Sequence, residues 1–256
     1  MGKKLTKFTP PHVRRISKFN QFIVRVKNIL LRIPYVFNQI FSEKIYVVLV
    51  CKLLAIDRKR DEYVYKGDYI LNSSIDLCAH EIKNKGVEGN VAEGGVYRGD
   101  RSKILNLAFP ERNLFLFDTF EGFNPNEQAA DLANKRLSSG SEQAGLFTDT
   151  SVELVLSKLR YPEKAVIRKG WFPDTTKGLE DEKYVFVWLD FDLYDPIYAG
   201  LCYFYPRLQE GGYIILDNYG DPNFKGVEEA VKRFSTENHV PYFPLTIFSG
   251  GCVFMK

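Results

Sequence analysis

Two apolar runs that end abruptly in acid or amide side chains constrain the fold of this chain most strongly. One run covers residues 184–189 and the other covers residues 213–216. In a parallel sheet that is buried on both faces, the strands have near-continuous apolar sequences. Ligands of such sheets bind at the edge where the strands end. We therefore expect the four polar side chains that follow the runs to converge there: Asp190, Asp192, Asp217 and Asn218.

These four side chains predict a cation site. Three carboxylates in one place repel each other unless a positive charge lies among them. Carboxylate and amide oxygens are the donors of a hard-cation site, of the kind that suits Mg²⁺.

The alternation of segments along the chain predicts an α/β fold. Its 256 residues suit one large domain, or one domain with an appendage. We predict a doubly wound, mostly parallel Rossmann-like sheet in residues 68–256, with an antiparallel C-terminal hairpin at 242–255 and a basic helical extension at 1–67. Residues 121–148 are predicted to be loop or short helix. The predicted strands cover residues 91–93, 113–118, 165–168, 184–190 and 212–217, and the predicted helices cover residues 70–85, 102–108, 151–159, 197–208 and 226–236.

The first 35 residues are a basic segment on an otherwise acidic chain. They hold nine Lys and Arg residues and no acid, which leaves 26 basic against 32 acidic residues in the rest. Within residues 16–33, apolar positions recur three and four apart, while Lys18, Arg25 and Arg32 recur every seven. This pattern predicts an amphipathic helix with a basic flank that ends near Pro34.

Three interpretations of this helix remain open: a docking or dimerisation helix, attachment to an anionic membrane surface, or a nucleic-acid arm. The last is disfavoured because nothing else in the chain has a pattern for base recognition. A second apolar run at 45–56 is too short to span a bilayer. Scattered cysteines and the lack of a cleavable signal pattern favour a cytoplasmic protein, with the inner face of the membrane as an alternative. We expect a homo-oligomer that binds no nucleic acid.

The segment Glu93-Gly-Gly-Val-Tyr-Arg-Gly99 lies between a predicted strand and a predicted helix. Its glycines permit the tight turn and close ligand approach of a nucleotide-binding first loop, although the GxGxxG spacing is incomplete. Arg98 and Arg101 would suit the pyrophosphate of a dinucleotide. The Glu93 carboxylate fits a cationic, phosphate-free nucleoside better, and S-adenosylmethionine is such a ligand. A purely structural turn is the alternative.

Two further motifs follow neighbouring predicted strands. Asp118 lies about twenty residues beyond the glycines, where an acid accepts hydrogen bonds from ribose hydroxyls. Trp171 and Phe172 follow another strand and are placed to wall an adenine ring, with a packed loop as the alternative.

Six segments together resemble the macrocin/mycinamicin sugar O-methyltransferase (TylF-type) family across roughly residues 68–256. The resemblance implies a class I, S-adenosylmethionine- and Mg²⁺-dependent methyl transfer to a sugar hydroxyl. The segments are Glu-Gly-Gly-Val-Tyr-Arg-Gly (93–99), Phe-Asp-Thr-Phe-Glu-Gly-Phe (117–123), Gly-Trp-Phe-Pro-Asp-Thr (170–175), Leu-Asp-Phe-Asp-Leu-Tyr-Asp (189–195), Tyr-Pro-Arg-Leu (205–208) and Gly-Gly-Tyr-Ile-Ile-Leu-Asp-Asn-Tyr-Gly (211–220).

The resemblance also implies roles for individual residues. Asp190, Asp217 and Asn218 would bind Mg²⁺, and Asp192 would be the general base. The family usually has two aspartates at the later pair, so this chain departs at Asn218 and loses one negative charge there. The related catechol O-methyltransferases have an Asp-Asn pair of this kind. The implied cofactor contacts are Glu93, Gly94, Gly95, Tyr97, Asp118, Thr119, Phe120, Gly170, Trp171, Phe172 and Asp190.

We therefore expect an O-methyltransferase whose acceptor is a glycan, a nucleotide sugar or a glycosylated natural product. Its acceptor selectivity is expected in residues 1–68 and 121–148, where the resemblance is weakest. A nicotinamide-dependent nucleotide-sugar oxidoreductase is one alternative, disfavoured because no Tyr-x-x-x-Lys pair follows a strand. A non-catalytic binding scaffold of the same fold is the other, left open by Asn218.

Overall fold

The computed structural model describes residues 61–65, 67–138, 147–245, 247 and 250–256. The amphipathic helix predicted at 16–33 and the apolar run at 45–56 lie outside the described residues. None of the described helices is long and apolar enough to cross a membrane.

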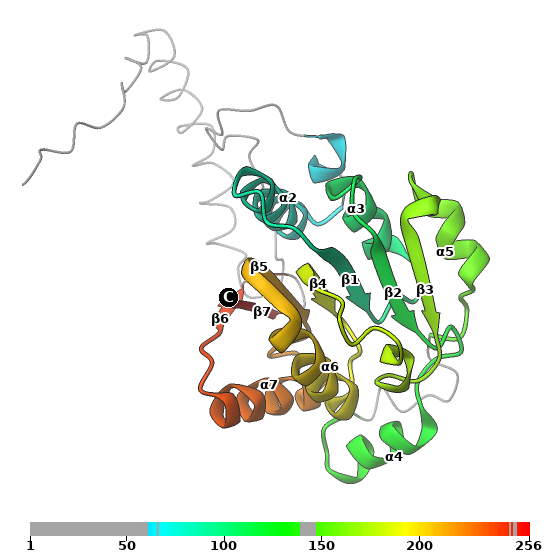
Figure 1. The fold of residues 1–256 in the computed structure, drawn as a ribbon. Helices are drawn as coiled ribbons and strands as arrows, with labels where there is room; N and C mark the ends of the chain where they lie inside the picture. Colours follow the sequence, from blue (N-terminus) through cyan, green and yellow to red (C-terminus); the bar gives the residue numbers. More distant parts are fainter. Residues whose placement is uncertain (1–60, 66, 139–146, 246, 248–249) are drawn as a thin grey trace, which may run out of the picture. The chain divides into compact units, whose positions relative to one another are not determined.

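Seven strands form one sheet in the order β3-β2-β1-β4-β5-β7-β6 (Figure 1). Strands β1 to β5 run parallel to one another, whereas β7 is antiparallel to both β5 and β6. The strand order reverses between β1 and β4, which is the topological switch point where such sheets bind ligands. The predicted doubly wound sheet with its C-terminal hairpin is confirmed. The strands are β1 (Asn90–Gly94), β2 (Leu114–Asp118), β3 (Ala165–Lys169), β4 (Tyr184–Leu189), β5 (Leu208–Asp217), β6 (Phe243–Leu245) and β7 (Gly251–Met255).

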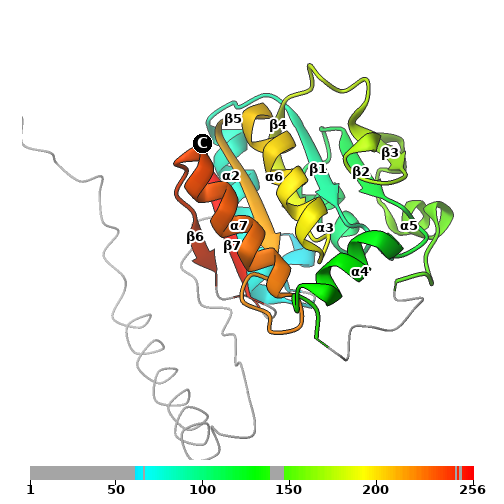
Figure 2. The same ribbon diagram turned by 90° about the horizontal axis from the view of Figure 1, so that it is seen from below.

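Helices cover both faces of the sheet (Figures 1 and 2). One core contains residues from α2 (Tyr69–Asn84), α3 (Asp100–Ala108) and α5 (Val152–Lys158). The other contains residues from α6 (Tyr194–Arg207) and α7 (Lys225–Asn238). Short 3₁₀ helices lie at Glu62–Tyr65, Pro162–Lys164 and Asp174–Thr176.

The sequence of strand β4 is apolar without interruption because the strand is buried on both faces. All six of its residues are buried. Val187 and Leu189 pack in the core beneath α6 and α7, while Phe186 and Trp188 pack in the opposite core. Because both faces are covered, neither set of alternating side chains meets water.

Two elements begin three or more residues before their predicted start. Helix α6 begins at Tyr194, three residues earlier than predicted, because Pro196 lies in the first turn, where a missing N–H costs no hydrogen bond. Strand β5 begins at Leu208, which pairs with Tyr184 before an irregularity in the register.

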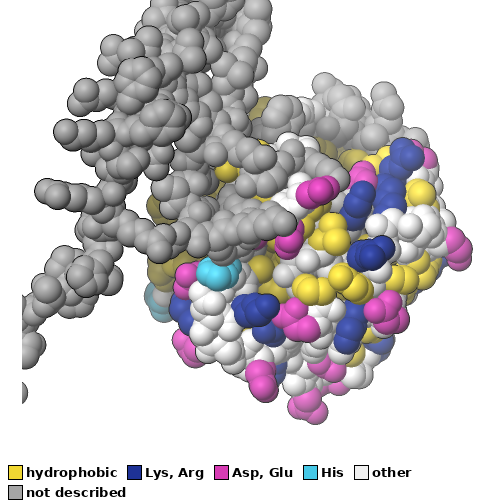
Figure 3. Space-filling model, turned by 90° about the horizontal axis from the view of Figure 1, so that it is seen from above, with side chains coloured by type: hydrophobic (Ala, Val, Ile, Leu, Met, Phe, Trp, Pro, Cys, Tyr) yellow, Lys and Arg dark blue, Asp and Glu magenta, His cyan; other side chains and the backbone are white. Residues whose placement is uncertain are grey.

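A short helix, α4 (Pro125–Ala133), occupies part of the segment predicted as loop or short helix. The Asn124 side chain caps it by accepting from Asn126 N at 3.0 Å, and Pro125 fills its first position. Figure 2 shows α4 in front of the carboxyl ends of the strands. Figure 3 views the molecule from the opposite side, where acidic, basic and hydrophobic side chains are interspersed over the described surface.

The turn after β1 presses against the end of β4. Asp190 N donates to Gly94 O at 2.7 Å. Gly95 has φ +82°, and a Cβ at this position would lie 2.0 Å from Asp190 O. Gly95 is therefore required both by its backbone conformation and by the close approach of the two strand ends.

We predict that Gly95→Ala lowers the free energy of unfolding by at least about 3 kcal/mol, because it adds a steric clash to backbone strain. Gly178 is a matched control, since its φ is +80° and a Cβ there would meet nothing within 4 Å. Gly178→Ala is expected to cost only the strain, about 1–2 kcal/mol. Urea denaturation of both variants provides the comparison, and equal losses would contradict a tight contact at Gly95.

Candidate active site

A cavity of about 280 Å³ opens at the carboxyl ends of β1 to β4. The loops after these strands supply most of its lining, as the sequence predicts for the ligand site of a parallel sheet. Predicted site residues that line it are Glu93, Gly95, Tyr97, Asp118, Thr119, Gly170, Trp171, Phe172, Asp190 and Asp192.

Asp118 holds the first loop in place. Its Oδ2 accepts hydrogen bonds from Val96 N at 2.6 Å and Tyr97 N at 2.9 Å. Its Oδ1 accepts from Phe120 N at 2.6 Å. The carboxylate that was predicted to face a ribose therefore also organises the backbone around the pocket.

Glu93 is a buried carboxyl group that lines the cavity. Its Oε2 accepts a hydrogen bond from Ser102 Oγ, whereas Oε1 has no hydrogen-bond partner among the described residues. Burial raises the pKa of Glu93 well above its usual value. An unpaired buried acceptor beside a cavity favours a ligand that brings a hydrogen-bond donor or a positive charge.

Two residues predicted to bind the cofactor lie outside the cavity lining. A Cβ at Gly94 would come within 2.5 Å of the Phe191 ring, so this glycine makes room for a side chain of the protein. The Phe120 side chain is buried in a core with residues of α3 and α5. Both positions shape the loops around the pocket rather than its surface.

The four polar residues after β4 and β5 lie close together. Asn218 Nδ2 is 3.5 Å from Asp190 Oδ1 and also contacts Asp192 Oδ1. Burial, and next the charge of Asp217, raises the pKa of Asp190 to about 7. Burial and the charges of Asp190 and Asp217 raise the pKa of Asp192 well above its usual value. The predicted convergence of these side chains is confirmed, although Asp217 and Asn218 do not line the cavity itself.

The group of residues predicted to bind Mg²⁺ contains few titratable side chains. In the described ranges, no three His, Cys, Asp or Glu side chains are grouped so as to hold a metal ion. The set predicted for Mg²⁺ has two carboxylates, Asp190 and Asp217, and its third member is the Asn218 amide. Hydrogen-bonding partners decide which end of such an amide faces a neighbour, so a cation would select the oxygen.

Arg101 is a basic residue whose charge acts on both Glu93 and Asp190. Its guanidinium lies 4.7 Å from the centre of the Trp188 ring and donates to Asn72 Oδ1 at 3.2 Å. Its charge opposes the rise in the pKa of both Glu93 and Asp190. Arg98 instead forms an ion pair with Asp149 at 3.3 Å.

Residues 121–148 were expected from the sequence to govern acceptor selectivity, but no site residue was predicted in the cavity wall that this segment forms. The wall comes from α4 and its neighbours, with Phe123, Asn124, Glu127 and Phe147 in the lining. The Phe147 ring packs edge-on against Phe123 and Tyr97, with ring centres 5.1 Å apart in both pairs. The Asn124-Pro125 start signal was available in the sequence, but the direction of the helix over the pocket was not.

The Glu127 carboxyl group on this wall has a raised pKa. Burial, followed by the charges of Asp195 and Asp131, raises its pKa from 4.5 to about 7. An acid with a higher pKa in the folded protein destabilises it as pH rises from the unfolded pKa through the folded one. The destabilising window here runs from about pH 4.5 to about pH 7.

We predict that Glu127→Gln is more stable than the native chain above pH 7, with a Tm higher by about 1–3 °C after allowance for solvent screening. The difference should vanish below pH 4.5, where both side chains are neutral. Thermal unfolding across this pH range provides the measurement, with the exposed Glu163→Gln as control. A Tm difference that does not change with pH would contradict the assignment.

Comparison with known proteins identifies structures with the same fold as this chain and a protein family whose model matches its sequence. Residues 50–256 match the family model described as macrocin-O-methyltransferase (TylF). The O-methyltransferase NovP has a similar structure, with a TM-score of 0.59 over 73% of this chain and 79% of that chain, at 22% identity. At that identity the likeness concerns the fold.

Two relatives match in sequence. The 8-demethyl-8-(2,3-dimethoxy-alpha-L-rhamnosyl)-tetracenomycin-C 4'-O-methyltransferase of Streptomyces olivaceus is 28% identical over 57% of this chain and 59% of its own length. Mycinamicin III 3''-O-methyltransferase of Micromonospora griseorubida is 28% identical over 63% of this chain and 66% of its own length. The chain thus spans less than two thirds of either relative. Because the family model matches most of its sequence, the chain belongs to the macrocin-O-methyltransferase (TylF) family.

Proposed function

We propose that this protein transfers the methyl group of S-adenosylmethionine to a hydroxyl group of a sugar, with Mg²⁺ bound beside the acceptor. Family membership is the observation that carries the proposal. The pocket supports it, because Glu93 and Asp118 line the same cavity as Asp190 and Asp192.

Three features of the pocket suit S-adenosylmethionine. The unpaired Glu93 carboxyl oxygen suits a ligand with positive charge and N–H donors. Asp118 lines the cavity and keeps acceptor capacity for ribose hydroxyls. Trp171 is 39% exposed at the cavity wall, where a purine ring would cover its apolar surface.

The acceptor is proposed to be a sugar on a glycosylated small molecule. The named relatives methylate a rhamnosyl-tetracenomycin and mycinamicin III. The α4 wall offers such a sugar apolar ring surface from Phe123 and Phe147, and a carboxyl group from Glu127. Together they suit a ring with apolar faces and hydroxyl edges.

The residues after β4 and β5 fit a hard cation. Asp190 and Asp217 provide two carboxylates, and Asn218 provides an amide oxygen. Burial and the charge of Asp217 raise the pKa of Asp190 to about 7, and a cation bound there would offset both effects. When bound, Mg²⁺ would supply positive charge that orients the acceptor oxygens and eases loss of the hydroxyl proton.

In the proposed reaction Asp192 is the general base. The acceptor hydroxyl gives its proton to the Asp192 carboxylate while its oxygen bonds to the methyl carbon. The bond from that carbon to sulfur breaks, and its electron pair stays on sulfur. The products are a methyl ether and S-adenosylhomocysteine, and Asp192 then returns its proton to water. Asn218 Nδ2 contacts the Asp192 carboxylate and so restrains its direction.

We predict that Asp192→Asn lowers kcat by about 10²–10⁴-fold, because the amide cannot take the proton. The affinity for S-adenosylhomocysteine, measured by calorimetry, should stay near the native value, because the protein carboxylates that are proposed to bind the cofactor are unchanged. Asp181→Asn, at an exposed position, is the control. Full activity of Asp192→Asn would remove this residue from the base role.

The substrate class is tested by a methyl-transfer screen against deoxysugar glycosides and nucleotide sugars. Methylation of any of these sugars supports the proposal. Binding of S-adenosylmethionine without transfer to any of them would point to a scaffold, and a preference for NADH would point to an oxidoreductase.

We predict that chelation by EDTA abolishes methyl transfer and that Mg²⁺ restores it. Asn218→Asp should lower the Mg²⁺ concentration for half-maximal activity by about tenfold, because it adds a negative charge to the donor set. Asn84→Asp adds the same charge at an exposed site outside the pocket and should leave that concentration unchanged. Activity that is insensitive to EDTA would contradict the metal requirement.

A further inference from the structure

We propose that Asp131 of α4 is a positioning residue that holds the turn carrying Asp192. The inference rests on the proposed methyl transfer, since it assigns a device that orients the base of that reaction. It concerns a residue that lines no part of the cavity and lies some sixty residues away in the sequence.

The turn between β4 and α6 lacks a cap of its own. Asp192 has φ 64°, in the left-handed region that aspartate adopts at a cost. Leu193 N donates to Phe191 O at 2.7 Å, which makes the turn tight. Leu193 occupies the capping position of α6, but its side chain accepts no hydrogen bond. The first N–H groups of α6 therefore need a partner from elsewhere.

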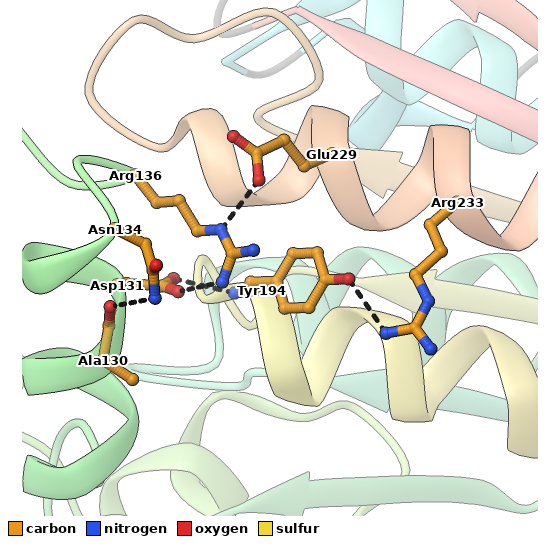
Figure 4. A network of polar contacts seen from close by, with 7 residues as sticks. All are labelled: Ala130, Asp131, Asn134, Arg136, Tyr194, Glu229 and Arg233. Carbon is orange, nitrogen blue, oxygen red and sulfur yellow. Dashed lines mark hydrogen bonds and ion pairs between the residues drawn. The ribbon is translucent and has the colours of Figure 1, made fainter.

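Asp131 supplies that partner (Figure 4). Its Oδ2 accepts a hydrogen bond from Tyr194 N at 2.9 Å. The residue is 3% exposed, so water competes little for this bond. Tyr194 lies two residues after Asp192. The bond therefore fixes the backbone on one side of the base, while Asn218 contacts its carboxylate on the other.

The C-terminal end of α4 places a cation beside this buried carboxylate. Lys135 adopts φ 57°, and Arg136 N then donates to Asp131 O at 2.8 Å, as in a Schellman motif. The Arg136 guanidinium lies 3.4 Å from Asp131 Oδ1 and 3.7 Å from the centre of the Tyr194 ring. Its Nε donates to Glu229 Oε2 at 2.8 Å. Arg136 thus offsets part of the cost of burying Asp131, although burial still raises the pKa of this carboxyl above its usual value.

Helix α7 makes room for the same contact. A Cβ at Gly226 would lie 2.9 Å from Asp131 Oδ2 and 3.2 Å from Tyr194 N. The chain after α4 also pairs with the loop after Asn218, since Ser138 N donates to Asn223 O at 3.2 Å. Asp131 and the chain that follows α4 thus connect this helix to both loops that carry the acidic site residues.

The experiment compares four variants by two readouts. The variants are Asp131→Ala, Asp131→Asn, Gly226→Ala and Glu229→Gln. Asp131→Ala removes the acceptor of the Tyr194 N–H, and Gly226→Ala crowds it from α7. Asp131→Asn keeps one acceptor oxygen, and Glu229→Gln alters only the outer, exposed ion pair of Arg136. The readouts are kcat with the affinity for S-adenosylhomocysteine, and hydrogen exchange of the peptide covering residues 190–197.

We expect Asp131→Ala to lower kcat by about 10²-fold, as a base displaced by about 1 Å would, with cofactor affinity unchanged. Exchange within residues 190–197 should become faster, and Gly226→Ala should change both readouts in the same direction. Asp131→Asn should recover most of the native values, and Glu229→Gln should match the native protein.

Two outcomes would overturn the inference. One is unchanged exchange within residues 190–197 in Asp131→Ala. The other is an equal loss of kcat in Asp131→Ala and Glu229→Gln. If the native protein transfers no methyl group, the proposed function fails, whereas hydrogen exchange still decides whether Asp131 holds the turn.

Discussion

Crowding of negative charge at one edge of a buried sheet is the constraint on which the rest of this structure depends. Burial and mutual repulsion raise the pKa of Asp190 and Asp192. The neighbouring groups reduce this cost, since the charge of Arg101 acts on Asp190 and the Asn218 amide donates to Asp192. The part of the cost that these groups do not offset favours binding of a positively charged ligand. Both proposed ligands, a sulfonium nucleoside and a divalent cation, carry such a charge.

The backbone is strained at equivalent positions along this edge, just after the ends of the parallel strands. Non-glycine residues adopt positive φ after four parallel strands: Tyr97 (48°), Phe120 (54°), Asp192 (64°) and Asn218 (60°). Each bend turns the chain sharply where a strand ends, and residues that follow the bends after β1, β2 and β4 line the cavity. Such conformations persist only where surrounding contacts hold them, and the hydrogen bonds to Asp118 and Asp131 are contacts of this kind.

Much of this arrangement could be predicted from the sequence. Uninterrupted apolar strands imply a covered parallel sheet, and polar residues after such strands must share one edge. Which neighbour occupies the space beside a residue at a strand end depends on the packing of the whole fold. Gly94 was therefore predicted to contact the cofactor, whereas the Phe191 ring fills the space beside it. The bond from Asp131 to Tyr194 joins residues whose proximity depends on the whole fold, so no local pattern identified it.

Helix α4 divides two tasks between its ends. At its start, Asn124 and Glu127 line the cavity. At its other end, Asp131 in the last turn and Arg136 just beyond the helix contact residues of α6 and α7. In an enzyme with the proposed activity, substitutions in the first turn would alter which sugar is accepted without releasing the base. Proteins with this architecture could therefore evolve specificity for new acceptors by few mutations. The residues that contact the acceptor and the residues that position the base lie at different ends of one helix.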